Sequence, residues 1–385
     1  MKSEKWNKIL SHALVALLSV TLTVAVMLGV FLVNRQNSPK LQVLEDLINK
    51  CFIGEVDQTA MEDAAASAMI EALGDRWSYY IPAKEYAEYM EQMNNAYVGI
   101  GVTITPEEDG SMRVIEVIAG GPSEEAGIQV EDRITGVDGQ SILGMSLDSS
   151  QTLIRGKENT SVAITVQRGE EELTLSVTRR RIRTVVAKGQ MLEGNIGLVT
   201  ITNFNSNCAS ETIAAIEKLM EDGAQRLIFD VRNNPGGYAE ELVKVLDYLL
   251  PEGKLFTTVD YAGKEHTDMS DAACLDIPMA VLVNQNSYSA AEFFAAAMME
   301  YEAAVIVGEK TSGKGYFQNT FVLPDGSAVG LSIGKYYTPN GKSLEKIGIT
   351  PDVEISLDAD TPVTGPMDDE QILAAINALA ESDFN

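Results

Sequence analysis

Residues 278–309 read PMAVLVNQNSYSAAEFFAAAMMEYEAAVIVGE, and this stretch decides the class of fold. Residues 278–283 are apolar enough for a buried strand, and residues 304–308 form a second apolar run. Between them, residues 290–301 are rich in the helix formers Ala, Met and Glu. A strand, a helix and a strand in this order predict a parallel pair of strands connected by a helical crossover.

The same alternation continues toward the amino terminus. Further apolar strands are predicted at residues 196–201 and 226–231, and helices at residues 208–221 and 238–250. The chain therefore predicts a mainly parallel α/β sheet. Ligand sites in such sheets cluster at the carboxyl ends of the strands.

Three loops follow strands of this predicted sheet, and each contains residues with catalytic potential. The loops are residues 230–237, 284–292 and 308–315. Gly236 and Gly237 can present backbone N–H groups to an oxyanion, although paired glycines also form ordinary tight turns. Ser289 stands at a strand-to-helix turn that suits a nucleophile, although Ser287 or Ser289 would equally serve as a helix cap.

The third loop holds Lys314 between Gly313 and Gly315. A phosphate-binding loop would have Ser or Thr after the lysine, so Gly315 argues against that function. In an apolar pocket the pKa of Lys314 would fall and the neutral amine could accept a proton from serine, whereas a solvated lysine would stay charged. The three loops together supply a nucleophile, oxyanion donors and a base, and they predict a Ser/Lys hydrolase.

Histidine and cysteine are too scarce for the commoner hydrolytic sites. The chain has two His, His12 and His266, and three widely spaced Cys. No zinc site of His or Cys type fits this inventory, and we expect neither a metal nor a cofactor. The formal net charge is −27, and because residues 1–40 hold five basic groups and one acid, the rest of the chain carries −31. So acidic a body argues strongly against nucleic acid as a partner.

The amino terminus carries a candidate membrane anchor. Residues 13–33 contain no charged side chain and are long enough to span a bilayer as a helix. Lysines at positions 2, 5 and 8 precede this run, which predicts a cytoplasmic tail at residues 1–12 and a catalytic body outside the cytoplasm. A cleaved signal peptide and a buried core helix are the alternatives. The length of the run and the absence of a small-residue cleavage site favour the anchor.

Two regions of different character follow the anchor. Residues 34–94 predict a helical segment, interrupted by the block Asp75–Tyr80 and continued by a helix at residues 83–93. Residues 95–180 predict a compact β domain with short helices near residues 123–127 and 149–155. Its expected strands are residues 99–104, 112–117, 133–137, 162–166 and 173–177.

With these motifs in view, the chain from about residue 41 to 355 resembles the carboxyl-terminal processing proteases, a family of tail-specific serine peptidases. The family's parts come in the same order: a helical segment with the 75–80 block, a PDZ domain and a protease core. The core motifs are residues 230–237, 287–292, 308–315, 335–341 and 348–352. The resemblance implies an α/β core of the crotonase/ClpP-like kind with an inserted β-rich PDZ domain and an N-terminal transmembrane helix. The implied divisions are 1–12, 13–33, 34–94, a PDZ domain at 95–180, a protease core at 181–356 and a tail helix within 357–385.

The resemblance also implies roles for individual residues. Ser289 matches the nucleophile, Lys314 the general base and Gln318 the residue that orients the lysine. The oxyanion donors would be backbone N–H groups of Ala290, Gly236 and Gly237, and the supporting polar positions are Glu292 and Thr311. Two departures from the family pattern are Ala291, where a third serine is usual, and Glu300, where some members have Asp.

The PDZ resemblance implies how substrates are recognised. Val98, Gly99, Ile100 and Gly101 match the loop whose N–H groups bind a terminal carboxylate while the peptide adds as a strand. Substrates would be proteins or peptides with apolar carboxyl tails, and the PDZ domain would gate access to the active site.

Three functions remain in competition at this level. The first is a membrane-anchored serine endopeptidase, the second a catalytically silent PDZ adaptor at the membrane, and the third acyl-CoA chemistry on a similar core. The presence of Ser289, Lys314 and Gln318 favours the first, and the PDZ insertion and the anchor disfavour the third. A homo-oligomer or an activating partner stays open.

Overall fold

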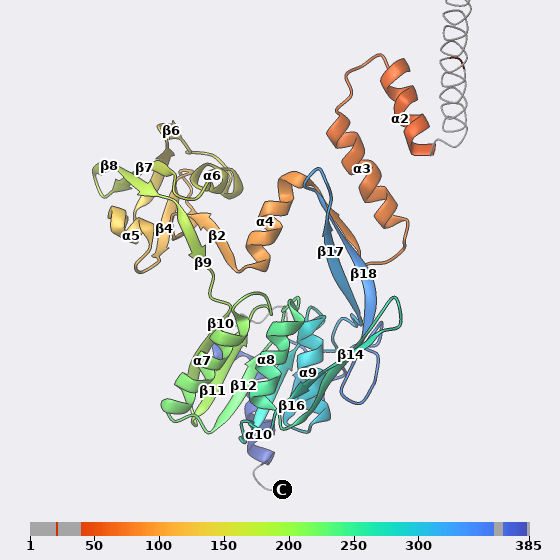
Figure 1. The fold of residues 1–385 in the computed structure, drawn as a ribbon. Helices are drawn as coiled ribbons and strands as arrows, with labels where there is room; N and C mark the ends of the chain where they lie inside the picture. Colours follow the sequence, from red (N-terminus) through yellow and green to blue (C-terminus); the bar gives the residue numbers. More distant parts are fainter. Residues whose placement is uncertain (1–20, 22–39, 358–364, 383–385) are drawn as a thin grey trace, which may run out of the picture. The chain divides into compact units, whose positions relative to one another are not determined.

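The computed structural model describes residue 21, residues 40–357 and residues 365–382 (Figure 1). Apart from Thr21, the anchor predicted at residues 13–33 lies outside these described residues. Within the described ranges, no helix combines the length and the apolar character that a membrane crossing requires. The chain divides into two compact units, residues 1–69 and residues 70–385.

Helices form the described part of the first unit, as the sequence predicts. Helix α2 covers Lys40–Cys51, and α3 covers Gln58–Glu71 and so runs on into the second unit. The Gln58 amide donates a 2.5 Å hydrogen bond to the Glu45 carboxylate, which joins the two helices. In the second unit, α4 (Ala83–Met93) confirms the helix predicted after Pro82.

A six-stranded sheet in the order β10-β11-β12-β15-β16-β19 forms the centre of the second unit. Its strands are β10 (Ala187–Leu192), β11 (Ile196–Ile201), β12 (Arg226–Asp230), β15 (Met279–Val283), β16 (Ala304–Gly308) and β19 (Val353–Glu354). β10 runs antiparallel to β11, and all other neighbouring pairs are parallel. The predicted mainly parallel sheet is confirmed, with β12, β15 and β16 side by side.

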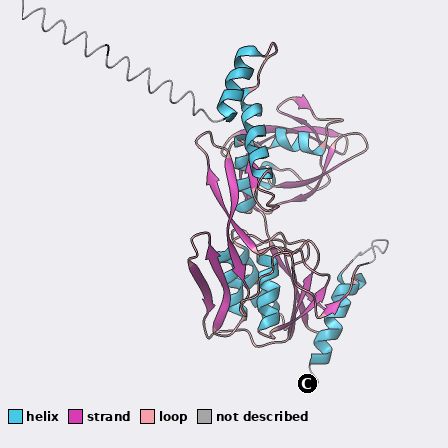
Figure 2. Ribbon diagram, turned by 90° about the vertical axis from the view of Figure 1, so that its right-hand side faces the viewer, coloured by secondary structure: helices cyan, strands magenta, loops and turns pink. Residues whose placement is uncertain are grey.

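Helices cover both faces of this sheet, because its strands are apolar on both sides. On one face Val281 and Val283 of β15 pack in a core with residues of three helices, α7 (Cys208–Glu221), α8 (Ala239–Leu249) and α9 (Ala290–Glu300). On the other face Ala280 and Leu282 pack with α10 (Glu370–Ser382). Figure 2 shows this last helix, next to the C label, on the opposite side of the sheet from the others.

A second, antiparallel sheet adjoins the core and is largely missed by the sequence analysis. Its order is β1-β18-β13-β14, with β17 also paired to β18. The strands are β1 (Tyr79–Ile81), β13 (Gly253–Asp260), β14 (Glu265–Ser270), β17 (Tyr316–Val322) and β18 (Ala328–Tyr337). β14 reads EHTDMS, which has no apolar alternation, so its pairing with β13 rather than its own pattern makes it a strand.

The predicted β domain has its own sheet and core. The sheet order is β3-β4-β5-β7-β8, with β6 paired to β5. Its elements are β3 (Val102–Pro106), β4 (Met112–Val117), α5 (Pro122–Ala126), β5 (Arg133–Val137), β6 (Gln140–Ser141), α6 (Leu147–Ile154), β7 (Ser161–Arg168) and β8 (Glu171–Thr178). The chain enters through β2 (Ala96–Gly99) and leaves through β9 (Arg180–Arg183), and these two strands pair antiparallel. The strand predicted at residues 99–104 is thus two strands separated by a turn at Gly101.

Candidate active site

The three loops singled out in the sequence meet at one edge of the central sheet. They follow the carboxyl ends of β12, β15 and β16, which are direct neighbours. The Asn284 amide donates to Asn233 Oδ1, and the Ser312 N–H donates to the Ser287 carbonyl. Each loop is therefore hydrogen bonded to the next.

Ser289 occupies a sharp turn at the start of α9. Its backbone has φ 58° and ψ −123°, a strained conformation for a residue with a side chain. Gly236 passes so close that a Cβ on it would lie 2.8 Å from Ser289 Cβ. Such a turn exposes the hydroxyl beside the free amino end of a helix, as the nucleophile turns of α/β-hydrolases do. Among the described residues, the Ala290 N–H has no hydrogen-bond acceptor.

The glycine turn next to Ser289 offers one free donor rather than two. The Gly236 N–H donates to Asn234 Oδ1 at 2.8 Å, so it is not available to a ligand. The Gly236 carbonyl accepts from the Phe204 N–H, and the Tyr238 N–H donates to the Phe204 carbonyl. The Gly237 N–H between them has no acceptor in the part of the chain that the structure describes. Of the three expected oxyanion donors, Gly237 and Ala290 remain free.

Glu292 is the buried centre of the site. Its carboxylate accepts four hydrogen bonds from Thr311 Oγ1 at 2.5 Å, Gly313 N at 2.7 Å, Lys314 N at 2.8 Å and Ser289 N at 3.1 Å. Burial raises the pKa of Glu292 above its ordinary value, against the lowering effect of these donors. This carboxylate links the turn at Ser289 to the lysine loop, residues 308–315, which holds Lys314.

Lys314 is held against aromatic rings. Its Nζ lies 4.8 Å from the centre of the Trp77 ring and 5.8 Å from that of Tyr288. Burial lowers the pKa of this amine to about 8, and the nearby carboxylates of Asp75 and Glu292 oppose the fall. No hydrogen bond among the described residues joins Nζ to Ser289 Oγ.

Gln318 and His266 lie outside this set of contacts. The Gln318 amide, on β17, donates to the Tyr316 carbonyl at 3.1 Å and to Ser332 Oγ at 3.0 Å rather than to Lys314. His266 lies in β14 with 70% of its side chain exposed and contacts Asp268. Glu300 at the end of α9 accepts from Thr338 Oγ1 and pairs with Lys342, so it anchors a loop.

A small apolar pocket opens beside Ser289. Its volume is about 10 Å³, roughly the least that a cavity needs to hold one water molecule. The lining residues are Gly237, Ala239, Leu242, Phe256, Ser289, Ala290, Phe293 and Tyr336. Such a pocket admits a group about the size of a methyl.

The β domain contains a groove of about 230 Å³ that includes three of the four residues expected to bind a carboxylate. Gly99, Ile100 and Gly101 line it, together with β3 and the end of α6. Val98 does not, and its N–H donates to Glu91 Oε1 at 3.2 Å. β3 pairs with β4 on one side alone, so within the described residues its other edge can accept an added strand.

Three residues of the site escape the sequence analysis as contributors to its geometry. Asn234 shapes the glycine turn through its side chain, and Ser287 donates from a buried hydroxyl to the Val231 carbonyl at 2.8 Å. Trp77 lies far from Lys314 in sequence, so no local pattern connects them. The Asp75–Tyr80 block is visible in the sequence, but its place beside the lysine comes from the pairing of β1 with β18.

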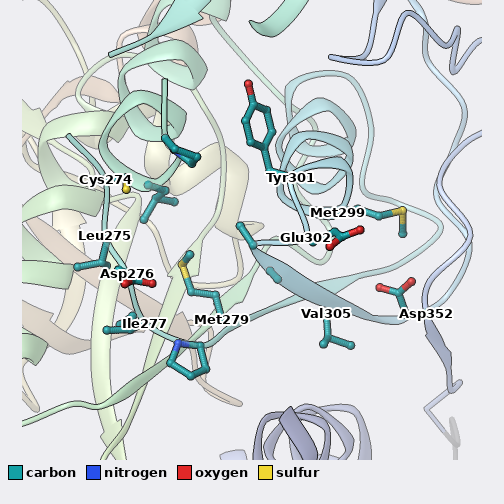
Figure 3. A pocket seen from close by; sticks show the side chains of 15 residues that line it. Cys274, Leu275, Asp276, Ile277, Met279, Met299, Tyr301, Glu302, Val305 and Asp352 are labelled. Atoms are coloured by element: carbon teal, nitrogen blue, oxygen red, sulfur yellow. The ribbon is translucent and has the colours of Figure 1, made fainter. Parts of the chain in front are cut away.

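A larger pocket lies away from these residues (Figure 3). Its volume is about 710 Å³, and it includes Met279 and Ala304, the first residues of β15 and β16. Because the three loops follow the carboxyl ends of the same strands, this pocket lies at the opposite end of the sheet. Cys274, Tyr301 and Glu302 surround it, and none of the predicted site residues does.

Comparison with known families matches two parts of the chain. The model of peptidase family S41 matches residues 195–355, and that of the PDZ domain matches residues 113–168. A "Probable CtpA-like serine protease" of Staphylococcus haemolyticus is 32% identical over 368 residues, which cover 92% of this chain and 74% of the relative. A protein of the same description from Staphylococcus aureus strain N315 is 34% identical over 336 residues, covering 86% of this chain and 66% of the relative's length. Among solved structures, the photosystem II D1 C-terminal processing protease is 28% identical, with a TM-score of 0.48 and coverage of 86% of this chain and 89% of that one.

Proposed function

Because the chain belongs to peptidase family S41, we propose that it is a serine endopeptidase with Ser289 as nucleophile and Lys314 as general base. The observation that carries this proposal is the Glu292 carboxylate, which accepts the backbone N–H groups of both residues. A neutral lysine is required for the base, and the lowered pKa of Lys314 supports that role.

The reaction would follow the usual course of acyl transfer. Ser289 Oγ attacks the carbonyl carbon of the peptide bond while its proton passes to Lys314 Nζ. For this transfer the amine must turn from the aromatic rings toward Oγ, since catalytic hydrogen bonds often tighten only when substrate is bound. The ammonium then gives the proton to the leaving amine. Water, activated by the same base, hydrolyses the acyl-enzyme.

The developing oxyanion would be bound by the N–H groups of Ala290 and Gly237. Both belong to turns beside Ser289, and both are free in the described part of the chain. Two donors of this kind stabilise the charge that appears in the transition state. Gly236 then has a different role, because its missing side chain lets the turn approach Ser289.

Substrates would enter as extended chains with a free carboxyl tail. The tail would lie along β3 in the groove of the PDZ domain, with its carboxylate at the N–H groups of Ile100 and Gly101, which have no acceptor among the described residues. The side chain before the cleaved bond would occupy the small pocket beside Ser289, which favours Ala and similarly small residues.

We also propose that residues 13–33 anchor the protein in a membrane with its catalytic body outside the cytoplasm. The support is the uncharged run of the sequence and the lysines before it. The acidic body fits neutral or basic protein tails.

The test uses the purified full chain in detergent with an unfolded protein that carries a five-residue tail of Ala, Val and Leu. Wild type, Ser289→Ala and Lys314→Ala are compared by mass spectrometry, with the fold of each checked by circular dichroism. Cleavage by wild type alone is the expected result. Equal cleavage by all three would contradict the proposal, and tight binding without cleavage would favour the PDZ adaptor.

A further inference from the structure

The loop Asp75–Ser78 is fixed to the protease core, although it lies far upstream of that core in sequence. Ser78 Oγ donates to Asp75 Oδ2 at 2.6 Å and accepts from the Ser332 N–H at 3.1 Å. Directly after the loop, β1 pairs with β18, with Tyr79 opposite Gly330. These contacts hold the loop against β18, where Ser332 pairs with Gln318 near the start of β17, the strand that follows the loop holding Lys314.

Trp77 of this loop forms one wall around the Lys314 amine. The Trp77 and Tyr288 ring centres lie 5.8 Å apart, with 31° between the planes, and Lys314 Nζ lies within 5.8 Å of both. A second cation, the Arg76 guanidinium, also lies over the Trp77 ring, with Cζ 4.0 Å from the ring centre. The aromatic faces attract the amine and exclude water from it.

The contacts of Trp77 come from its ring rather than from its polar atom. Its indole N–H is buried and has no hydrogen-bond partner among the described residues. A buried donor without an acceptor costs stability, so hydrogen bonding does not explain why the indole lies here. The ring faces, against Lys314 and Tyr288, are what the position uses.

The charged groups around Lys314 come from three parts of the chain: the Asp75–Ser78 loop, helix α9 and the loop after β18. Asp75, Glu292 and Glu345 favour the ammonium, and Arg76 disfavours it. Burial outweighs them and lowers the pKa of the amine. The pKa of the Lys314 amine therefore depends in part on Asp75 and Arg76, which lie outside residues 195–355, the part of the chain that matches the protease family model.

We propose that Trp77 is a positioning residue for the catalytic base, holding the Lys314 amine in a dry aromatic pocket beside the nucleophile turn. This inference rests on the proposed Ser/Lys chemistry. The Trp77 ring has two opposite effects on the protonation of the Lys314 amine. Exclusion of water favours the neutral amine, whereas attraction by the π face favours the ammonium.

Three substitutions of Trp77 distinguish these effects. In Trp77→Ala, water reaches the amine, so the acidic limb of the pH–rate profile moves up by about one pH unit and the rate at pH 7 falls about tenfold. In Trp77→Leu an apolar wall remains without a π face, so the limb stays or moves to lower pH. Trp77→Phe keeps both effects and stays within about threefold of wild type. Tyr261→Ala removes an aromatic side chain that is 85% exposed and serves as the control.

The readout is the rate at which a fluorophosphonate labels Ser289 in the full chain, measured from pH 6 to pH 10. Acetylation of Lys314 by acetic anhydride, followed by mass spectrometry over the same range, titrates the amine without any need for catalysis. Circular dichroism and thermal unfolding confirm that each variant is folded.

The two measurements separate the possible failures. An amine that titrates alike in wild type, Trp77→Ala and Trp77→Leu overturns the role of Trp77, whatever the labelling shows. If Ser289 of wild type is not labelled while the amine titration still shifts in Trp77→Ala, the proposed protease chemistry fails and the aromatic pocket stands. Should Trp77→Ala be unfolded, Trp77→Leu and Trp77→Phe decide: a limb above that of wild type in either one overturns the proposal.

Discussion

The backbone N–H groups of Ser289 and Lys314 donate to the same atom, Glu292 Oε2, over 3.1 Å and 2.8 Å. The second oxygen of that carboxylate accepts from Thr311 Oγ1 and Gly313 N. One buried side chain thus holds the backbones of the proposed nucleophile and its base together. Apart from this carboxylate, the Ser312 N–H also joins the two loops by donating to the Ser287 carbonyl.

Glu292→Gln should therefore impair both the activity and the fold. An amide offers one acceptor oxygen, and its NH₂ group would face backbone donors, so at least one hydrogen bond is lost. We expect a loss of about 2–4 kcal/mol in the free energy of unfolding. Displacement of the two loops should lower kcat about a hundredfold. Urea unfolding and steady-state kinetics measure the two effects. Glu302→Gln, an exposed change just after the same helix, is the control, and equal behaviour of the two variants would contradict this role.

The pH dependence of cleavage should report Lys314. Because the neutral amine is the proposed base, kcat/KM should rise with pH and reach half its maximum near the lysine pKa of about 8. His266→Ala should leave the profile unchanged, since that side chain is largely exposed and belongs to β14. A midpoint near pH 6.5 that disappears in His266→Ala would instead indicate a histidine base.

Removal of the buried amine should stabilise the protein. The pKa of Lys314 is about 8 in the folded chain, against an ordinary value of 10.5, so burial of the ammonium costs about 3 kcal/mol at pH 7. Between pH 8 and pH 10.5 the unfolded chain binds more protons at this residue, and the stability of wild type rises with pH. The free energy of unfolding of Lys314→Met should therefore exceed that of wild type most at pH 7 and least near pH 10.5.

Urea unfolding at several pH values tests this expectation. Lys310→Met changes an exposed lysine of the same loop and should have little effect on stability. If Lys314→Met is no more stable than Lys310→Met at pH 7, burial of the Lys314 ammonium does not destabilise the folded protein.

The sequence predicts the parts of this fold that have strong local patterns. Strands β15 and β16 are continuous apolar runs, and β12 has three apolar residues between Arg226 and Asp230. Ser289 and Lys314 follow β15 and β16 at turns marked by small residues. Neighbouring parallel strands necessarily bring such loops together, so the core of the site follows from the pattern.

Contacts that depend on pairing over long sequence distances could not be predicted in this way. β14 has no apolar alternation, and the place of Trp77 depends on the pairing of Tyr79 with Gly330. The hydrogen bond from the Gly236 N–H to Asn234 Oδ1 likewise could not be predicted from the sequence, because paired glycines allow many backbone conformations.

The small pocket beside Ser289 should select the residue before the cleaved bond. With about 10 Å³ available, Ala should be preferred over Leu by one to two orders of magnitude in kcat/KM. Leu242→Ala enlarges the pocket and should reduce that preference about tenfold. The control is Leu246→Ala, the same change one turn further along α8 at a buried position that does not line the pocket. Paired substrates that differ only at this residue give the measurement, and an equal shift in both variants would contradict the assignment.

Recognition of the substrate tail should involve Arg155 at the end of α6. Its guanidinium carbon lies 5.3 Å from the centre of the Tyr97 ring, one nitrogen lies 3.8 Å from Glu88, and the side chain lines the same groove as Gly99 and Gly101. A carboxylate bound at the N–H groups of Ile100 and Gly101, which line this groove too, would therefore meet a positive charge. Because this arginine is exposed, the attraction is about 1 kcal/mol, so Arg155→Gln should raise KM about fivefold for a substrate with a free terminal carboxyl.

The matching substrate with an amidated carboxyl terminus separates charge from shape. Its KM should be the same for wild type and Arg155→Gln, because no carboxylate is present to lose its partner. Lys157→Gln removes an exposed charge from the same domain and should change neither KM. Added salt should weaken the effect of Arg155→Gln, since an exposed pair is screened. An equal rise in KM for the free and the amidated tails would mean that Arg155 shapes the groove rather than binding the carboxylate.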